Sequence, residues 1–538
     1  MIWKQLLYFF FPILLGTFFQ QMYNTVDAVV VGQYVGTEAL AAVGGTAGTL
    51  INLLVGFFVG LSSGATVIIA QFWGSGDKDR VSKTVHTGIA MSIAGGAILM
   101  VIGVVFAPTI LGWMNTPEDV IDLSAVYVRI YCSGMIPSLI YNVGSSILRA
   151  VGDAKRPLYF LIVCCLANIV LDLFFVLALD MGVAGVGIAT VLSQVISAVL
   201  VIVTLLRSET AIRLFPKKIA ITGWLLKDIV RIGLPAGFQS VLYSLSNIVV
   251  QTAVNAFGTT VIAAYTAYGK MDGLFWMIIG AFGVSITTFV GQNFGAQKFD
   301  RMHRSVRVCL AMAFIATILL EVIFLAGGEF ILGLFSRDPA VIAEGVDITW
   351  HIAPTFVLYV CIEILSGALR GTGDSLVPMI MTCVGVCLLR VVWILAVAPH
   401  FNTVAWTLYS YPVSWGVTSV LFIVYYLQGG WLKRRKKAMA SRWNKLPISL
   451  KKALTNPSGN AIIIHVPGNG IVFGSLAQLV EHIVHIDGVT GSSPVATTRI
   501  LSRKSEDFLY FHTFSPQSER SNKRKEKKRE PSSAARYP

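Results

Sequence analysis

Two carboxylates stand inside long apolar runs of the sequence, where charged side chains are rare. Asp27 lies in the first run and Asp172 in the fifth. Asn168 comes one helical turn before Asp172, and Thr190 follows in the sixth run. Their oxygens are hard donors, so they could bind a sodium ion or share a proton if the helices converge. An ionised group at a membrane helix centre costs about 2.5 to 3.5 kcal/mol and therefore needs a partner or a purpose.

Other polar side chains recur at helical spacing. Gln20, Asn24 and Asp27 are four and three residues apart and would share one helix face. Glu363 and Arg390 could neutralise each other as a buried pair, or Glu363 could be a second acidic group that faces a substrate. Together these positions predict a polar cavity lined by Gln20, Asn24, Gln239, Tyr243, Asn247, Gln251, Glu363 and Arg390.

The elements that position these side chains are membrane helices. Of the 538 residues, 55% are hydrophobic and 13% charged, whereas a soluble protein has about 25% charged residues. Spanning a bilayer takes about 20 apolar residues, and twelve such runs can be placed. They cover approximately residues 7–32, 48–72, 87–111, 121–147, 157–179, 183–206, 232–256, 272–294, 307–333, 345–369, 377–399 and 403–427.

The sequence contains an internal duplication. "QFWGSGDKDR" from Gln71 returns as "QNFGAQKFDR" from Gln292, and "LRAVGDAKRP" from Leu148 returns as "LRGTGDSLVP" from Leu369, both at an offset of 221 residues. This duplication predicts an all-α integral membrane protein of two parallel six-helix lobes around a central cavity. We expect an N-lobe over residues 1–206, a cytoplasmic linker over 207–231 and a C-lobe over 232–430.

The two copies differ where the carboxylates lie. At the local offsets, Asp27 corresponds to Val250 and Asp172 to Ile394. The carboxylates could hydrogen-bond neighbouring helices for packing alone, but a packing role common to both lobes would appear in both copies. We therefore expect the cation site, made by Asp27, Asn168, Asp172 and Thr190, in the first lobe only.

The shared loops are candidates for hinges or gates. Gly74, Gly76 and Gly295 supply backbone freedom in the first repeated motif. In the "LRxxGD" motifs, we expect salt-bridged turns at cytoplasmic helix ends. These turns would pair Arg149 with Asp153 and Arg370 with Asp374.

Charge also sets the orientation and marks the tail. Alternate loops hold nearly all the basic residues, and the opposite set has only Lys270 and Arg337, which places both termini in the cytoplasm. Up to Gln428 there are 22 Lys and Arg against 21 Asp and Glu, and after it 20 against 7. The basic excess therefore belongs to residues 431–538, which we expect to be disordered and not to bind nucleic acid.

The stretch "GSLAQLVEHIVHIDGVTGSSPVATT" from Gly474 has an unusual origin in our interpretation. It can be back-translated into the conserved D-arm and T-arm sequences of a transfer-RNA gene. We expect that the reading frame lost its stop codon and ran through a neighbouring tRNA gene from about residue 474, so that the residues from roughly 440 onward are not a selected domain. The nucleotide sequence would contradict this if it held no such gene.

The part of the chain that precedes the tail resembles the multidrug and toxic compound extrusion (MATE) family, in its DinF-like branch. "PILLGTFFQQMYNTVDAVVVGQYVG", "NIVLDLFFV" and both "LR-GD" loops carry the resemblance, which extends to about residue 430. It implies a V-shaped alternating-access transporter that exchanges sodium ions or protons for organic cations or other amphiphiles. The resemblance also implies that the cation residues are Asp27, Asn168, Asp172 and Thr190. The family's second-lobe carboxylate on the seventh helix has no counterpart here.

We expect a monomeric antiporter of the cytoplasmic membrane, in contact with lipids, that needs no cofactor besides the coupling ion and exports small cationic or amphiphilic molecules. One alternative is a lipid-linked oligosaccharide flippase of the same superfamily, for which Arg390 and Arg129 would be the cavity arginines. A passive channel or scaffold is a further alternative. An enzyme is not expected, because the sequence has no phosphate loop, zinc-ligand cluster or nucleophile motif.

Overall fold

The computed structural model describes residues 1–444, 461–466, 470–475, 498–500 and 509–511. Each apolar run forms a helix, and several runs are built from two or more consecutive helical pieces. In the N-lobe the pieces are α1 (Ile2–Val30), η1 (Val31–Val35), α2 (Thr37–Gly44), α3 (Thr46–Gly74), α4 (Lys78–Trp113), α5 (Glu118–Ser133), α6 (Met135–Ala150), α7 (Lys155–Leu173), η2 (Phe174–Ala178) and α8 (Gly182–Leu206).

The C-lobe repeats this order after the short turn η3 (Pro216–Lys218). Its pieces are α9 (Gly223–Asn255), α10 (Thr259–Gly295), α11 (Phe299–Gly333), α12 (Pro339–Ile352), η4 (Ala353–Thr355), α13 (Phe356–Gly371), α14 (Leu376–Thr382), η5 (Cys383–Leu388), α15 (Leu389–Val392), η6 (Trp393–Val397), α16 (Ala398–Phe401), α17 (Val404–Leu408) and α18 (Ser410–Gln428).

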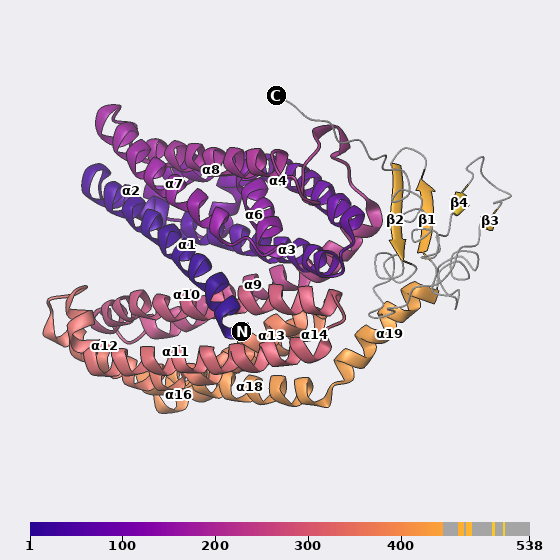
Figure 1. Cartoon of the computed structure of the whole chain (residues 1–538). Helices are drawn as coiled ribbons and strands as arrows, with labels where there is room; N and C mark the ends of the chain where they lie inside the picture. Colours follow the sequence, from indigo (N-terminus) through magenta and orange to yellow (C-terminus); the bar gives the residue numbers. More distant parts are fainter. Residues whose placement is uncertain (445–460, 467–469, 476–497, 501–508, 512–538) are drawn as a thin grey trace, which may run out of the picture. The chain divides into compact units, whose positions relative to one another are not determined.

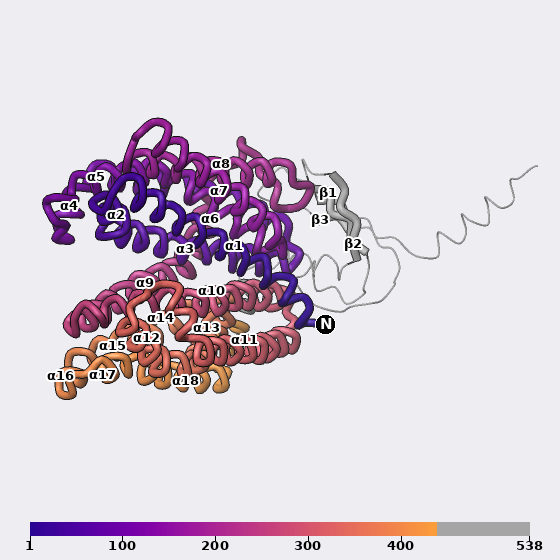
Figure 2. The backbone as a smooth tube through the Cα atoms, turned by 90° about the vertical axis from the view of Figure 1, so that its left-hand side faces the viewer, coloured from indigo at the N-terminus to yellow at the C-terminus, as the bar shows by residue number. Residues whose placement is uncertain are grey.

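The two sets of helices form two bundles. In Figure 1, α1 to α8 make the upper, purple bundle and α9 to α18 the lower, pink and orange bundle; the bundles meet beside α3 and α9 and separate on the opposite side. Figure 2 looks toward the separated side, where α1 runs from the N-lobe to the C-lobe. The helical part of the chain, residues 1–74 and 78–435, thus has the predicted two-lobed V.

Ten helices of the described part are long and apolar enough to span a bilayer, and the pair α5 and α6, bent by 51°, makes an eleventh. The remaining expected run, the seventh at residues 232–256, lies in α9, which is 33 residues long but too polar to meet the same criterion. The expected loop before residue 272 is wrong, because α10 begins at Thr259. Lys270 therefore lies inside a helix and not in a connection.

The lobes touch through glycines of α3 and α9. A Cβ atom built on Gly60 would lie 2.5 Å from the Gly237 Cα, and one on Gly64 would lie 2.2 Å from the Ile229 carbonyl oxygen. Such distances allow no side chain, so the two backbones cross in direct contact. The absence of side chains at this crossing lets the two helices approach closely, and beside it Leu225, Ile229 and Ile232 of α9 pack in one hydrophobic core with N-lobe side chains.

The remaining unit contains residues 75–77 and 436–538. Helix α19 (Gly430–Asn444) leads into it, and two antiparallel two-stranded sheets are described there, β1 (Ala461–Val466) with β2 (Gly470–Ser475) and β3 (Thr498–Ile500) with β4 (Leu509–Phe511). The register of β1 on β2 pairs Ala461 with Ser475 and Val466 with Gly470. Most of the segment interpreted as a tRNA-gene translation lies outside the described residues, and that interpretation remains a prediction.

Two neighbouring glycines of α4 test the packing within the N-lobe. A Cβ on Gly96 would lie 2.7 Å from the Ile136 Cα, whereas a Cβ on Gly95 would meet only the Leu139 Cδ1, at 3.8 Å. We expect Gly96→Ala to lower the free energy of unfolding by about 1 to 3 kcal/mol, because it overpacks a backbone contact. Gly95→Ala should leave it equal or raise it by about 0.5 to 1 kcal/mol.

Thermal unfolding of the two variants in detergent checks this expectation. Equal unfolding temperatures for Gly95→Ala and Gly96→Ala would contradict the α4–α6 packing described here.

Candidate functional site

The structure brings the four predicted cation-site residues together in the N-lobe. Asp27 comes from α1, Asn168 and Asp172 from α7, and Thr190 from α8. The side chains of Asp172, Asn168 and Thr190 lie around the Asp27 side chain. Asp27 is 6% exposed, Asp172 and Asn168 are fully buried, and Thr190 is 2% exposed.

The polar atoms of this cluster are buried without hydrogen-bond partners. Asp27 Oδ1, both carboxylate oxygens of Asp172 and both amide atoms of Asn168 lack one. The Thr190 hydroxyl donates to the Val186 carbonyl oxygen at 2.9 Å, which leaves its lone pairs free to accept. Buried polar groups are normally satisfied, so a cluster of unsatisfied oxygens indicates a place for a cation or a proton.

Both acidic helices change their winding next to the site. The π-helical turn η1 follows Asp27 by four residues on α1, and η2 follows Asp172 by two residues on α7. The two turns contact each other. Because π-helical turns release and shift backbone hydrogen bonds, they allow α1 and α7 to bend beside the carboxylates.

A cavity of about 220 Å³ lies beside this cluster. Helices α1, α3, α6, α7 and α8 contribute most of its lining, which includes Gln20, Tyr23, Tyr131 and Gln194. Gln20 therefore has its predicted position. Asn24 does not share this face, since it is exposed and its Nδ2 donates to the Gln21 Oε1 at 3.4 Å. Tyr23, the preceding residue on α1, lines the cavity where Asn24 was expected.

The predicted polar residues of the C-lobe form separate contacts. The Tyr243 hydroxyl donates to the Tyr359 hydroxyl at 3.0 Å, the Gln251 Nε2 donates to Asn255, and Gln239 is buried. The Arg390 Nη1 donates to the Asn247 Oδ1 at 3.0 Å. The Arg390 guanidinium also lies 4.2 Å from the centre of the Tyr411 ring, a cation–π contact.

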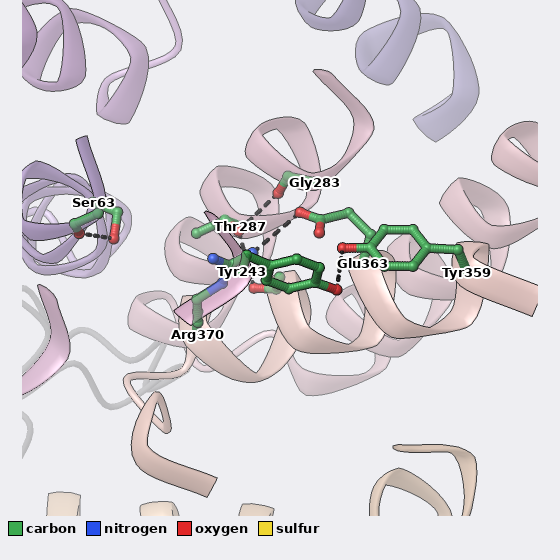
Figure 3. A network of polar contacts seen from close by, with 9 residues as sticks. Ser63, Tyr243, Gly283, Thr287, Tyr359, Glu363 and Arg370 are labelled. Atoms are coloured by element: carbon green, nitrogen blue, oxygen red, sulfur yellow. Dashed lines mark hydrogen bonds and ion pairs between the residues drawn. The ribbon is translucent and has the colours of Figure 1, made fainter. Parts of the chain in front are cut away.

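The expected pair of Glu363 with Arg390 does not form. Glu363 instead lies 3.2 Å from the Arg370 Nη2, as Figure 3 shows beside the Tyr243–Tyr359 contact. Arg370 is seven residues along α13 from Glu363, so two helical turns bring both side chains to one face. Gly283 of α10 makes room for the carboxylate, because a Cβ there would lie 2.1 Å from the Glu363 Oε1.

The predicted salt bridges within the "LRxxGD" motifs are also wrong. Asp153 binds Arg156, with 3.2 Å between the Arg156 Nε and the Asp153 Oδ2. Asp374 accepts from the Tyr425 hydroxyl at 2.9 Å and lies 3.9 Å from the Arg434 Nη2. Asp153 thus contacts the start of α7, and Asp374 contacts the end of α18 and the start of α19, so neither aspartate pairs with the arginine of its own motif.

The duplicated loops instead contact each other across the lobes. The Gln71 Nε2 donates to the Gly371 carbonyl oxygen at 2.9 Å, and the Gln292 Nε2 donates to the Ala150 carbonyl oxygen at 2.8 Å. These two bonds are copies of one another, since both ends differ by 221 residues. The first bond links the end of α3 in the N-lobe to the C-terminal end of α13 in the C-lobe. The second links the end of α10 in the C-lobe to the C-terminal end of α6 in the N-lobe.

Two glycines allow this approach. A Cβ on Gly74 would lie 2.0 Å from the Gln292 carbonyl oxygen, and a Cβ on Gly295 would lie 2.0 Å from the Gln71 carbonyl oxygen. Gly76 has a φ of +74°, the left-handed region that glycine adopts freely. We call the set Gln71, Gly74, Ala150, Gln292, Gly295 and Gly371 the glutamine latch.

One buried carboxylate was missed in the sequence. Asp272 of α10 accepts from the Trp276 Nε1 at 2.7 Å and from the Tyr268 hydroxyl at 3.4 Å. The expected helix began at residue 272, which put Asp272 at a membrane edge, where a carboxylate needs no explanation. The spacing of Tyr268, Asp272 and Trp276, four residues each, was the available signal for a helix that begins earlier.

No group of three or more His, Cys, Asp or Glu side chains in the described residues could hold a metal ion. The chemistry of this site is thus that of two carboxylates, an amide and a hydroxyl.

Comparison with known proteins agrees with this architecture. The MatE family model matches residues 12–174 and 235–395, one match in each lobe. The probable multidrug resistance protein YoeA of Bacillus subtilis is 29% identical over 446 residues, which cover 81% of this chain and 95% of YoeA. The multidrug export protein MepA of Staphylococcus aureus is 21% identical, with 76% of this chain and 90% of MepA covered.

Solved structures share the fold. One, described as the outward-facing conformation of a multidrug resistance MATE family transporter, superposes with a TM-score of 0.73 at 21% identity and covers 81% of this chain and 96% of its own. Another, a MATE in the bent conformation, gives a TM-score of 0.74. With both halves matched by the family model, this chain belongs to the MATE family, whose members are membrane transporters and not enzymes.

Proposed function

We propose that this protein is an antiporter of the cytoplasmic membrane that exports cationic or amphiphilic drugs in exchange for sodium ions or protons. The observation that carries the proposal is the buried cluster of Asp27, Asn168, Asp172 and Thr190, in which Asp27 Oδ1, the Asn168 Oδ1 and both Asp172 oxygens lack partners. Relatives named as multidrug resistance and multidrug export proteins support a drug as the exported molecule. The chain works as a monomer with both termini in the cytoplasm.

The coupling follows from the charge of the pair. Two carboxylates at contact distance in a low dielectric repel each other, so they need a proton or a cation between them. Entry of the ion neutralises the pair and allows α1 and α7 to bend at η1 and η2. Because the cavity lies beside these helices, bending changes its shape and expels what it holds.

For a neutral or zwitterionic substrate the membrane potential can drive the exchange. One net charge that moves down 100 mV releases about 2.3 kcal/mol, which corresponds to a substrate gradient of roughly fiftyfold before any chemical gradient is added. One ion exchanged for one monovalent organic cation moves no net charge, so the chemical gradient of the ion drives that exchange.

The flippase alternative has less support. The Arg129 Nε donates to the Val104 carbonyl oxygen, and Arg129 does not line the cavity. Arg390 is 1% exposed and is held by Asn247 and the Tyr411 ring. Neither candidate arginine thus presents its charge to an anionic headgroup.

The glutamine latch gives the proposal its gate. Its loops lie on the side with most basic residues, which the positive-inside rule assigns to the cytoplasm. The lobes touch there and separate on the other side, so we assign the structure to an outward-open state. Opening toward the cytoplasm would break both glutamine bonds.

Asp27→Asn and Asp172→Asn are each expected to abolish ion-driven efflux, because neither variant can hold a charged carboxylate pair around the ion. Efflux of a fluorescent cation from inverted vesicles, with sodium and pH gradients imposed separately, measures this and identifies the driving ion.

Asp180→Asn is the matched control. Asp180 is exposed, and its backbone φ of +51° suits Asn equally well, so efflux should be unchanged. Full ion-driven efflux by Asp27→Asn would remove the mechanism, and wild-type efflux that depends on neither gradient would favour a channel or flippase.

Gln71→Leu and Gln292→Leu test the gate. Each removes one of two equivalent bonds, worth about 0.5 to 1.5 kcal/mol, so each should raise the population of the inward-open state roughly two- to tenfold. The double variant should raise it by about the product of the two. Labelling of a cysteine in place of Ser240, whose side chain faces Gly56 at the lobe crossing, by a thiol reagent added from the cytoplasmic side of vesicles reports that population.

Asn293→Leu is the control, because its Nδ2 bonds only to the Phe289 carbonyl oxygen of its own helix. Equal labelling of the Gln71→Leu, Gln292→Leu and Asn293→Leu variants would refute the latch.

A further inference from the structure

The cavity of the N-lobe has an unexpected polarity. Arg149 lines it, and no carboxylate does. The remaining lining is neutral, with tyrosines, amides, hydroxyls and aliphatic side chains. A cavity that binds only organic cations would place an acid there, as the aromatic and acidic sites for cations do.

Arg149 is not neutralised by any acid in the part of the chain that the structure describes. Its Nη2 donates to the Ser146 Oγ at 3.2 Å, and the ion pairs found involve other residues. Beside it, the Tyr141 hydroxyl is buried without a hydrogen-bond partner and also lines the cavity. Neither the Arg149 guanidinium nor the Tyr141 hydroxyl thus has a negatively charged partner, and both face the same space.

The duplication shows what this arginine lacks. Arg370, the equivalent residue in the C-lobe, lies 3.2 Å from Glu363. At the offset of 221 residues, Glu363 corresponds to Asn142, and Asn142 lines the same cavity as Arg149. Gly283, which makes room for the Glu363 carboxylate, corresponds at the same offset to Ser62 in the N-lobe.

One copy of a neutral Arg–Glu pair has therefore become an arginine beside an amide at the wall of a cavity. The Arg149 side chain is partly buried, and a guanidinium that loses water without gaining a counter-ion is destabilised, so a negatively charged molecule that enters the cavity would stabilise it. The cavity, at about 220 Å³, is smaller than the roughly 300 to 1,000 Å³ of drug-sized sites, so it holds one end of a larger molecule.

We propose that this end of the N-lobe cavity is an anion subsite, in which Arg149 and Tyr141 donate hydrogen bonds to a carboxylate, sulfonate or phosphate of an amphipathic molecule. The aliphatic wall, which includes Ile13, Leu158 and Leu161, contacts the apolar part. That the molecule is an exported substrate rests on the proposed function, whereas the subsite itself does not. The molecules that this protein exports would then include acidic and zwitterionic amphiphiles besides cations.

The test is equilibrium binding to the purified full chain in phosphatidylcholine nanodiscs, followed by fluorescence polarisation. Dansylglycine and dansylcadaverine carry the same ring with opposite charges. Wild type should bind dansylglycine more tightly. Arg149→Gln should weaken dansylglycine about tenfold to a hundredfold, because a charge-assisted bond is lost, and should not weaken dansylcadaverine.

Three further variants sharpen the result. Asn142→Glu restores the carboxylate of the C-lobe pair, so it should also weaken dansylglycine while Arg149 stays in place. Arg149→Lys should retain more affinity than Arg149→Gln, since the charge remains. Arg129→Gln is the control, because Arg129 lies outside the cavity and should leave both affinities unchanged.

A second arm distinguishes the sources of the anion. Phosphatidylglycerol added to the nanodiscs should compete with dansylglycine through Arg149 if a lipid headgroup occupies the subsite, and it should not compete if a soluble substrate does. The subsite is overturned if wild type binds dansylcadaverine as tightly as dansylglycine, or if Arg149→Gln keeps the wild-type affinity for dansylglycine.

Because no gradient is imposed, this measurement is independent of the efflux test. Loss of the anion preference would leave ion-driven efflux through Asp27 unaffected, and loss of that efflux would leave the preference unaffected.

Discussion

Two carboxylates buried within apolar helices, with oxygens that no donor satisfies, set the main constraint on this fold. Such a cluster survives only where the surrounding structure holds it in place, since each unmet oxygen costs free energy. The cluster therefore needs three helices, α1, α7 and α8, to converge at one level. To lower this cost the helices have to move, and the π-helical turns beside Asp27 and Asp172 are where α1 and α7 can bend.

The duplication divides the molecule into features that both lobes keep and features that one lobe has changed. Both keep the glutamine and the glycine of the first motif, since the two lobes close by the same bond made twice. A gate built from two equal bonds opens only when both break, which makes closure cooperative. The proposed sites for ion and substrate need no such symmetry, because the proposed mechanism uses one copy of each.

The lobes, the helix order and the cation cluster could be predicted from the sequence because they depend on periodicity and on rare residues. The cluster forms because a carboxylate inside an apolar helix is costly unless other polar side chains surround it. Its members are Asp27, Asn168, Asp172 and Thr190. The partners of Arg149, Arg370 and Asp374 could not be predicted. Each had an acid or base nearby in sequence, but side-chain direction from the helix decided the pairing, and direction depends on the packing of α10 and α18.

Helix boundaries produced the other errors. Polar residues at 265–272 resemble a loop, but in α10 their side chains satisfy each other: the Tyr265 hydroxyl bonds to Tyr411, and Tyr268 and Trp276 bond to Asp272. A helix end read from composition assumes that polar groups seek water. Inside a two-lobed membrane protein they can find one another instead, so a stretch too polar for lipid can still lie in the membrane.

The same reasoning explains α9, which is too polar for a lipid-facing span. Its polar positions contact other protein groups: Tyr243 bonds to Tyr359, and Asn247 bonds to Arg390. Its glycines meet the backbone of α3 at the lobe crossing. A helix that faces the partner lobe on one side and a polar lobe interior on the other has little lipid to face. The span that contains α3 lies at the same crossing with a mean hydropathy of 2.2, so the low hydropathy of α9 comes from its polar contacts within the C-lobe and not from the crossing itself.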